Sequence, residues 1–216
     1  MKTKIYNLII LDESGSMQSI KKAAIDGMNE TVQSIRSAQT KHEDQEHFVT
    51  LITFNSEKIK GIYNCVPAAE VKELTEDEYI PNCCTPLYDA MGCALNELRP
   101  RIKPEDKVLV TIITDGEENS SSEYDSPAIK ALVEELKEAG WIFAYIGANQ
   151  DAVYVAQTIS VTNVMNFQAT EHGTNSMMSK LKKSRNRMWD KISEGTFMAC
   201  ESNINFFKEE DDDDEE

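Results

Sequence analysis

The sequence predicts an α/β protein with a doubly wound, mostly parallel six-stranded sheet and helices on both faces. First, apolar β-rich runs alternate with stretches of helical periodicity, which is typical of parallel strands joined by crossover helices. Second, 216 residues with 40% hydrophobic residues are enough for one sizeable core. Third, only one pair of runs is joined by a short turn, so the remaining connections are expected to be crossovers.

Six apolar runs are predicted to be strands. In chain order they cover residues 4–11, 48–54, 58–63, 108–114, 141–146 and 161–167. The second and third are joined by the short turn at Asn55 and Ser56, so this pair is expected to be an antiparallel hairpin.

Apolar residues spaced three and four apart predict the helices between these strands. The buried stripes are Ile20, Ala24, Met28, Val32 and Ile35; Leu87, Met91, Ala94, Leu95 and Leu98; Ile129, Leu132, Val133 and Leu136; and Met177, Met178, Leu181, Met188, Trp189 and Ile192. The second helix follows Pro86, and the third runs from Ser126 to Gly140. A short helix is expected from Asp151, and the last long helix over residues 174–192.

Charge divides the chain into a domain, residues 1–207, and an acidic tail, residues 208–216, that we expect to be disordered. The net charge is −16, and residues 209–216 are all Asp or Glu. The rest of the chain carries 30 acidic against 22 basic residues. Phosphate backbones and anionic membrane surfaces would repel such a chain, so neither nucleic acid nor membrane is expected as a partner.

The compartment is predicted from apolar runs and cysteines. The only long apolar run near the amino end, residues 5–11, is too short for a signal sequence or a membrane span. The five cysteines are odd in number and form no CxxC pair, which favours reduced thiols in the cytoplasm. The adjacent Cys83 and Cys84 leave a soft-metal or redox site open as an alternative.

Polar residues follow two of the predicted strands. The first strand ends in Asp12, and Ser14 and Ser16 come directly after it. The fourth strand ends at Thr114 and Asp115. Right-handed crossovers allow the two strands to be neighbours, so both aspartates are expected at the carboxyl edge of the sheet, where open α/β sheets place ligands. Carboxylates and hydroxyls together suit a hard cation such as Mg²⁺.

These residues resemble the von Willebrand factor A (vWA) family and its metal-ion-dependent adhesion site. Asp12, Ser14 and Ser16 match the family's Asp-x-Ser-x-Ser motif, Thr85 matches its distant threonine, and Asp115 with Gly116 matches its later aspartate. The resemblance covers residues 3–192. One departure is the Cys83 and Cys84 pair, where the family often carries glycines.

The resemblance implies a strand order of 3-2-1-4-5-6 with the third strand antiparallel. It also implies a six-coordinate Mg²⁺ or Mn²⁺ bound by the serine and threonine hydroxyls, with the aspartates bound directly or through water. One coordination position would stay open for a ligand from outside, typically an Asp or Glu of a partner protein. The chain is therefore expected to be a metal-dependent protein-interaction module.

Each residue has a simpler interpretation when it is taken alone. Asp12 could be a capping or turn residue, Thr85 could be the N-cap of the following helix, and Asp115 could belong to a plain turn. Glu117 and Glu118 are predicted to form an acidic rim around the site. The convergence of five such residues on one sheet edge favours the metal site.

We expect no enzymatic activity. His42 and His47 precede the second strand and belong to the opposite edge, and His172 follows the outermost strand. No phosphate-binding loop and no nucleophile elbow is present in the sequence. The alternative that remains is an Mg²⁺-dependent hydrolase or phosphatase, because a bound metal can itself polarise a phosphate.

Overall fold

The computed structural model describes residues 2–115, 118–148 and 152–208. They form one six-stranded sheet in the order β3-β2-β1-β4-β5-β6. The strands are β1 (Thr3–Asp12), β2 (Gln45–Asn55), β3 (Lys58–Pro67), β4 (Lys107–Thr114), β5 (Ile142–Ala148) and β6 (Asn163–Phe167). Only β3 is antiparallel to its neighbour. The predicted fold class and strand order are therefore confirmed.

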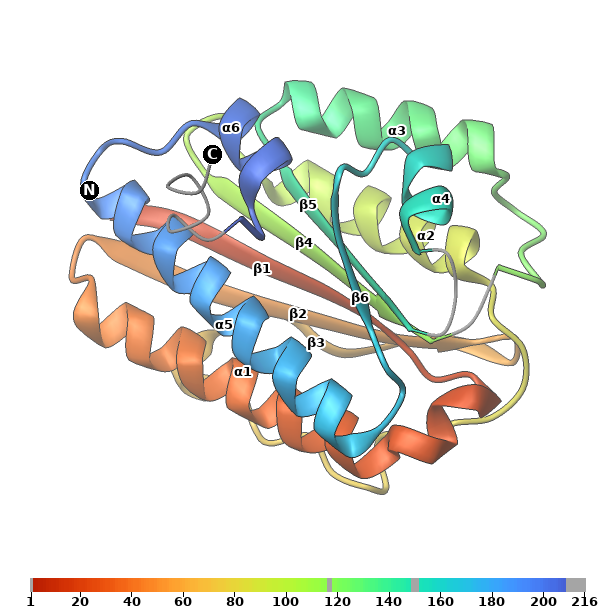
Figure 1. The fold of residues 1–216 in the computed structure, drawn as a ribbon. Helices are drawn as coiled ribbons and strands as arrows, with labels where there is room; N and C mark the ends of the chain where they lie inside the picture. The colour runs from red at the N-terminus through yellow and green to blue at the C-terminus, as the bar shows by residue number, and fades with distance from the viewer. Residues whose placement is uncertain (1, 116–117, 149–151, 209–216) are drawn as a thin grey trace, which may run out of the picture.

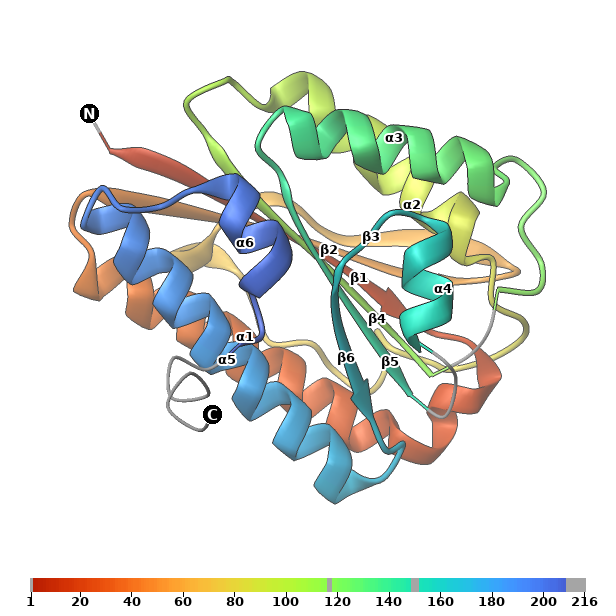
Figure 2. The same ribbon diagram turned by 45° about the horizontal axis from the view of Figure 1, so that its top comes forward.

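Helices cover both faces of the sheet (Figures 1 and 2). The helices are η1 (Gly15–Ile20), α1 (Lys21–Lys41), η2 (Ala68–Glu70), α2 (Leu87–Leu98), η3 (Arg99–Arg101), α3 (Ser126–Glu138), α4 (Ala152–Thr158), α5 (Glu171–Ser193) and α6 (Ala199–Asn205). On one face α1 and α5 pack side by side, and on the other α2, α3 and α4 lie together. All the carboxyl ends of the parallel strands therefore meet at one edge.

Strand alternation builds the two core layers. In β1, Ile5 and Ile9 point to the α1 and α5 face, whereas Leu8 and Ile10 point to the α2 and α3 face. Because both faces are covered, β1 is a nearly continuous buried run rather than an alternating one. The central strand is thereby fixed from both sides, and so is the loop that follows it.

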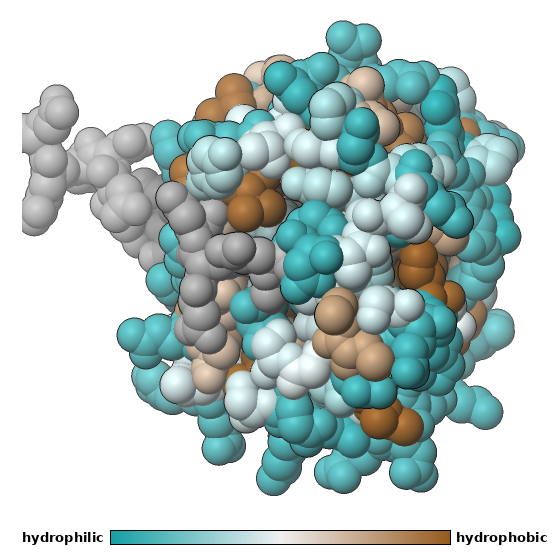
Figure 3. Space-filling view, turned by 90° about the vertical axis from the view of Figure 1, so that its right-hand side faces the viewer, coloured by the Kyte–Doolittle hydropathy of each residue, from teal (hydrophilic) through white to brown (hydrophobic). Residues whose placement is uncertain are grey.

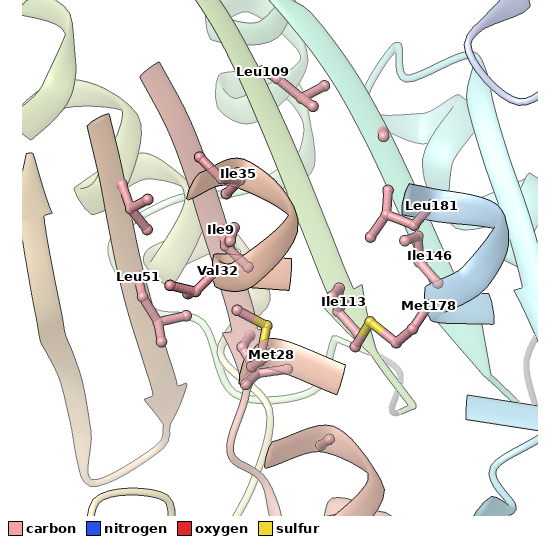
Figure 4. Packing of buried hydrophobic residues seen from close by; sticks show 14 of the residues in the cluster. Ile9, Met28, Val32, Ile35, Leu51, Leu109, Ile113, Ile146, Met178 and Leu181 are labelled. Atoms are coloured by element: carbon pink, nitrogen blue, oxygen red, sulfur yellow. The ribbon is translucent and has the colours of Figure 1, made fainter. Parts of the chain in front are cut away.

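The α1 and α5 layer is packed closely (Figure 4). Met28 and Val32 of α1 lie over the sheet beside Ile9 and Leu51, and Met178 of α5 lies near Ile113. The helices approach closely at Gly27, where an added Cβ would lie 2.5 Å from the Met178 Cγ. Any larger residue at position 27 would therefore have to displace the Met178 side chain.

The structure agrees with the predicted hairpin and changes the predicted ends of some strands and helices. The β2–β3 turn forms as expected, and the Asn55 side chain accepts the backbone N–H groups of Glu57 and Lys58 at 3.0 and 3.1 Å. β3 runs on to Pro67, and α5 begins at Glu171 because Thr170 caps it by accepting the Gly173 N–H at 3.0 Å.

The sequence analysis missed α6, whose single buried polar residue, Asn203, bonds the backbone of Trp141 and Phe143. The predicted helix start at Asp151 and the tail beyond Lys208 lie outside the described residues. Within the described ranges no helix is long and apolar enough to cross a membrane.

Candidate functional site

The predicted residues of β1 and β4 meet at the carboxyl edge. β1 and β4 are parallel neighbours with Leu11 opposite Ile113, so the loops after them leave the sheet side by side. The Ser14 and Ser16 hydroxyls lie 3.1 Å apart, and Ser16 donates to Asp115 Oδ1 at 2.6 Å. Tertiary folding has thus connected the first motif to a residue 99 positions away.

Asp12 is fixed by groups that the sequence analysis did not assign. Its Oδ1 accepts the Ser14 N–H at 2.7 Å, and its Oδ2 accepts the Thr114 hydroxyl at 2.6 Å. Its carbonyl accepts the Tyr79 hydroxyl at 2.6 Å. Burial raises the pKa of Tyr79 well above its usual value, so this phenol remains a donor. The position of Thr114 at the end of a strand, next to Asp115, was a usable signal, whereas nothing in the sequence pointed to Tyr79.

Both carboxyl groups are buried, and burial disfavours their charged forms. Asp12 is 0% exposed and Asp115 is 8% exposed. Burial raises the pKa of Asp12 to about 6, and the nearby Asp115 charge contributes in the same direction. Burial also raises the pKa of Asp115. The ion pairs among the described residues involve neither aspartate, so no side-chain cation offsets the two charges.

Thr85 lies at the same edge, where the loop after β4 binds its backbone. Its N–H donates to Asn119 Oδ1 at 2.9 Å, and its carbonyl accepts the Asn119 N–H at 3.1 Å. The side chain of Thr85 does not cap α2, because the N-cap residue is Pro86. The N-cap interpretation of Thr85 is therefore wrong, and Asn119 is a further residue of the site that sequence reasoning missed.

The segment before Thr85 is anchored to both neighbouring loops. Gly15 N–H donates to the Cys83 carbonyl at 3.0 Å. The Cys84 N–H donates to the Ser56 hydroxyl, and the Cys84 carbonyl accepts the Ser56 N–H, each at 3.1 Å. The first motif, the hairpin turn and the threonine loop therefore form one connected rim.

The backbone strain in this rim lies at a cysteine. Cys83 has a φ of 63°, in the left-handed region that favours glycine. Gly15, between the two serines of the first motif, opens η1 without a positive φ. The position where the resembled family often carries glycine is thus the one whose backbone here suits glycine, although cysteine occupies it.

Glu118 does not face outward as the prediction of an acidic rim required. Glu118 turns inward, and its carboxylate accepts the N–H groups of Tyr88, Ser120 and Ser121 at 3.0, 2.9 and 2.7 Å. Glu13 is fully buried and accepts the Ile80 N–H at 2.7 Å, with Lys58 Nζ at 3.5 Å. Gly116 and Glu117 lie outside the described residues.

The surface at this edge is shown in Figure 3. Hydrophilic and intermediate residues dominate the visible face, and hydrophobic residues form separate spots. Because Glu118 and Glu13 are held inward, their carboxylates bind the protein's own groups instead of facing an approaching ligand.

The histidines lie away from this cluster. His47 is buried in β2 and bonds Gln45, while His42 follows α1 and bonds Ser193. His172 lies in the first turn of α5. Within the described ranges, no group of three or more His, Cys, Asp or Glu side chains is placed to hold a metal ion. Any metal at this edge would therefore depend on hydroxyl oxygens as well as on the two carboxylates.

The donor set nevertheless fits a hard divalent cation. The side chains that gather here, two carboxylates and the Ser14 and Ser16 hydroxyls, all offer oxygen atoms. The Asp12 carboxylate is linked to this cluster by the backbone N–H of Ser14. Mg²⁺ and Mn²⁺ prefer such ligands, and a divalent charge would offset the two buried carboxylates. Chemically, this arrangement can bind a cation and present it to the solvent beside the exposed Ser16.

Comparison with known proteins gives information about the fold of this chain. No protein-family model matches the sequence, and no curated protein matches it. Among solved structures, the chain is similar to the vWF domain of the type V pili tip protein Mfa5 from Porphyromonas gingivalis. The TM-score is 0.58 at 10% identity, covering 92% of this chain and 98% of that one.

Two further structures are similar. The SpRpn10 VWA domain has a TM-score of 0.53 at 10% identity, covering 81% of this chain and 93% of that one. The PilB minor pilin from Streptococcus sanguinis has a TM-score of 0.57 at 15% identity, covering 87% of this chain and 62% of that one. This chain therefore spans less than two thirds of the pilin. Identities this low show the fold alone, and the fold of this chain is vWA-like.

Proposed function

We propose that this chain is a metal-dependent protein-interaction module that binds a carboxylate of a partner protein through Mg²⁺ or Mn²⁺. The metal ligands in this proposal are Asp12, Ser14, Ser16, Thr85 and Asp115. The vWA-like fold is in keeping with a protein-interaction module in general. The observation that carries the metal-dependent part is the pair of buried aspartates, linked through Ser14 and Ser16. Among the residues that the structure describes, no basic side chain forms an ion pair with either of them.

The chemistry of the donor set explains how the ion would bind a partner. Two carboxylates balance the charge of a divalent cation, while hydroxyl ligands are neutral and leave it electrophilic. A ligand with an anionic oxygen would then complete the coordination. The carboxylates of Glu118 and Glu13 accept hydrogen bonds from the protein's own N–H groups, so they do not line the approach of an incoming Asp or Glu.

We further propose a binding module rather than an enzyme. The described histidines lie in β2, after α1 and in the first turn of α5, away from the aspartates of the site. A cytoplasmic location is part of the same proposal, since the five cysteines are free thiols and reduced thiols persist in a reducing compartment. The acidic net charge favours a protein partner over nucleic acid or membrane.

Isothermal titration calorimetry tests the metal site directly. Mg²⁺ and Mn²⁺ are expected to bind the wild type, and Asp12→Ala is expected to abolish binding. Asp26→Ala is the matched control, because Asp26 is an exposed aspartate on α1. If the wild type binds neither ion at millimolar concentration, the proposed function is wrong.

A pull-down experiment tests whether a partner protein binds through the metal. In a pull-down with Mg²⁺, Thr85→Ala is expected to recover much less partner than the wild type while retaining much of the metal affinity, because Asp12, Ser14 and Ser16 still hold the ion from one loop. Thr40→Ala, at an exposed position of α1, is the control. A partner recovered equally with chelator, or equally by Thr85→Ala, would place recognition on another surface.

A further inference from the structure

Two adjacent thiols lie at the rim of the candidate site. Cys83 and Cys84 are both exposed free cysteines, and the next residue, Thr85, is buried at 3% exposure. Among the described cysteines, this is the only pair of sequence neighbours. A reagent in solution can therefore reach both sulfurs without opening the fold.

The backbone of this pair is held by the loops that form the site. Cys83 is bonded to Gly15, between the two serines of the first motif, and Cys84 is bonded twice to Ser56 of the hairpin turn. Thr85 is bonded twice to Asn119. A change in the backbone at residues 83–84 must therefore act on the Asp12 loop and on Thr85.

We propose that Cys83 and Cys84 form a reversible redox modification site that controls metal binding at this edge. The proposal rests on the proposed function, because the regulated event is the binding of the cation. The modification is a disulfide between the two neighbouring cysteines, and the co-reactant is a hydroperoxide.

The chemistry balances with one equivalent of hydrogen peroxide. One sulfur attacks the peroxide O–O bond, forming a sulfenic acid and releasing one water. The second sulfur displaces the hydroxyl group from the sulfenic acid, which forms the S–S bond and releases a second water. Together the two thiols lose two protons and two electrons, and the peroxide is reduced to two molecules of water. A dithiol reductant reverses the change by thiol–disulfide exchange.

Geometry explains why this disulfide would act as a switch. Disulfides usually join residues whose Cα atoms are roughly 4.4–6.8 Å apart, whereas consecutive Cα atoms are about 3.8 Å apart. Closing the ring therefore requires the peptide between Cys83 and Cys84 to rearrange, and the bonds to Gly15 and Ser56 restrain that same peptide. The strain makes the disulfide easy to reduce, and the rearrangement displaces Thr85.

The test compares metal affinity before and after oxidation. The protein is treated with one equivalent of hydrogen peroxide, and the peptide that contains residues 83–84 is analysed by mass spectrometry. We expect it to lose two hydrogen atoms, and Mn²⁺ affinity by calorimetry to fall by about 5–150-fold, the usual range for coupling between two sites. Dithiothreitol should restore both the mass and the affinity.

Three variants complete the design. Cys83→Ser and Cys84→Ser should bind Mn²⁺ as the reduced wild type does and should keep that affinity after peroxide. Serine is close to cysteine in size, so it adds no new strain at the positive φ of residue 83. Cys93→Ser, at an exposed position of α2, is the matched control and should respond as the wild type does.

The outcomes separate this inference from the proposed function. If the reduced protein binds no metal, the proposed function fails and the inference fails with it. If the reduced protein binds metal but no disulfide forms within the pair, or if the oxidised protein binds metal equally well, only the redox site is overturned. An intermolecular disulfide in place of the internal one would also overturn it.

Discussion

The two edges of the sheet bury polar residues in different ways. At the amino edge, Gln45 and His47 are 0% exposed, and the Gln45 amide donates to the Trp189 carbonyl and to the Ser193 hydroxyl, each at 2.7 Å. At the carboxyl edge, Asp12 is equally buried but carries a charge with another carboxylate nearby. The amino edge pairs neutral donors with acceptors, whereas the carboxyl edge concentrates acceptors.

This difference separates a structural cluster from a candidate binding site. A neutral buried network needs no counterion, and its remaining cost is limited to unpaired atoms such as His47 Nδ1 and Trp189 Nε1. Buried carboxylates without a counterion leave a cost that a bound cation would remove. Metal is therefore expected to change the stability of the carboxyl edge most, and protonation that of the amino edge.

The largest expected effect is metal stabilisation of the carboxyl edge. With Mg²⁺ at about 100 times its Kd, the free energy of unfolding should rise by about 2.7 kcal/mol, which corresponds to an increase in Tm of about 5–11 °C for a chain of this size. Asp12→Asn should abolish this shift in differential scanning fluorimetry, and His172→Gln should retain it. A full shift in Asp12→Asn would show that the ion binds elsewhere.

Protonation should weaken the amino edge. Burial lowers the pKa of His47 from 6.5 to about 4, so the folded protein holds this imidazole neutral while the unfolded chain protonates it near pH 6.5. The stabilising contribution is complete above pH 6.5 and is lost as the pH falls towards 4. Between pH 7.5 and 4.5 the loss amounts to about 2–3 kcal/mol.

The measurement is urea denaturation between pH 7.5 and 4.5. His47→Gln should flatten the loss of stability relative to the wild type, since it removes the titrating group. His172→Gln, at an exposed position on α5, should leave the profile unchanged. Parallel profiles for the wild type and His47→Gln would mean that other groups govern the acid sensitivity.

A smaller effect is expected when Asp115 is replaced in the metal-free protein, and it is a gain in stability. The folded-state pKa of this carboxyl is raised, so its charged form opposes folding at neutral pH. Asp115→Asn keeps an acceptor for the Ser16 hydroxyl and should stabilise the metal-free protein by up to about 1 kcal/mol at pH 7.5. The gain should be smaller at pH 3.5, which is below the ordinary pKa of aspartate and well into the range where a carboxyl with a raised pKa is protonated. Destabilisation at both pH values would contradict this account.

The smallest expected effect concerns the hydrogen bond that links the Thr85 loop to the loop after β4. Asn119→Ala removes the side-chain acceptor of the Thr85 N–H, and we expect Mn²⁺ affinity in calorimetry to fall by about fivefold, close to 1 kcal/mol. Ser122→Ala is the control, because Ser122 contributes its backbone N–H to Asp89. Unchanged affinity in Asn119→Ala would show that Thr85 is positioned by α2 alone.

Local patterns in the sequence were enough to predict the strands and most of the helices, whereas the strand order was implied by the resemblance to the vWA family. Six apolar runs separated by helical stripes gave the strands, and the short turn at Asn55 gave the antiparallel pair, because alternation, periodicity and turn chemistry are local properties. The run of α6 is short and weakly apolar, so it produced no such signal. Its buried Asn203 acquires a role only when β5 lies beside it.

The sequence by itself determined which residues end β1 and β4 and that they carry oxygen ligands, since a strand's carboxyl end follows from its own pattern. Only the tertiary structure decided how these residues are held. Tyr79 and Asn119 act across long separations, and Glu118 was expected at the rim but binds backbone N–H groups. A side chain's orientation depends on partners that are distant in sequence, and no local pattern encodes them.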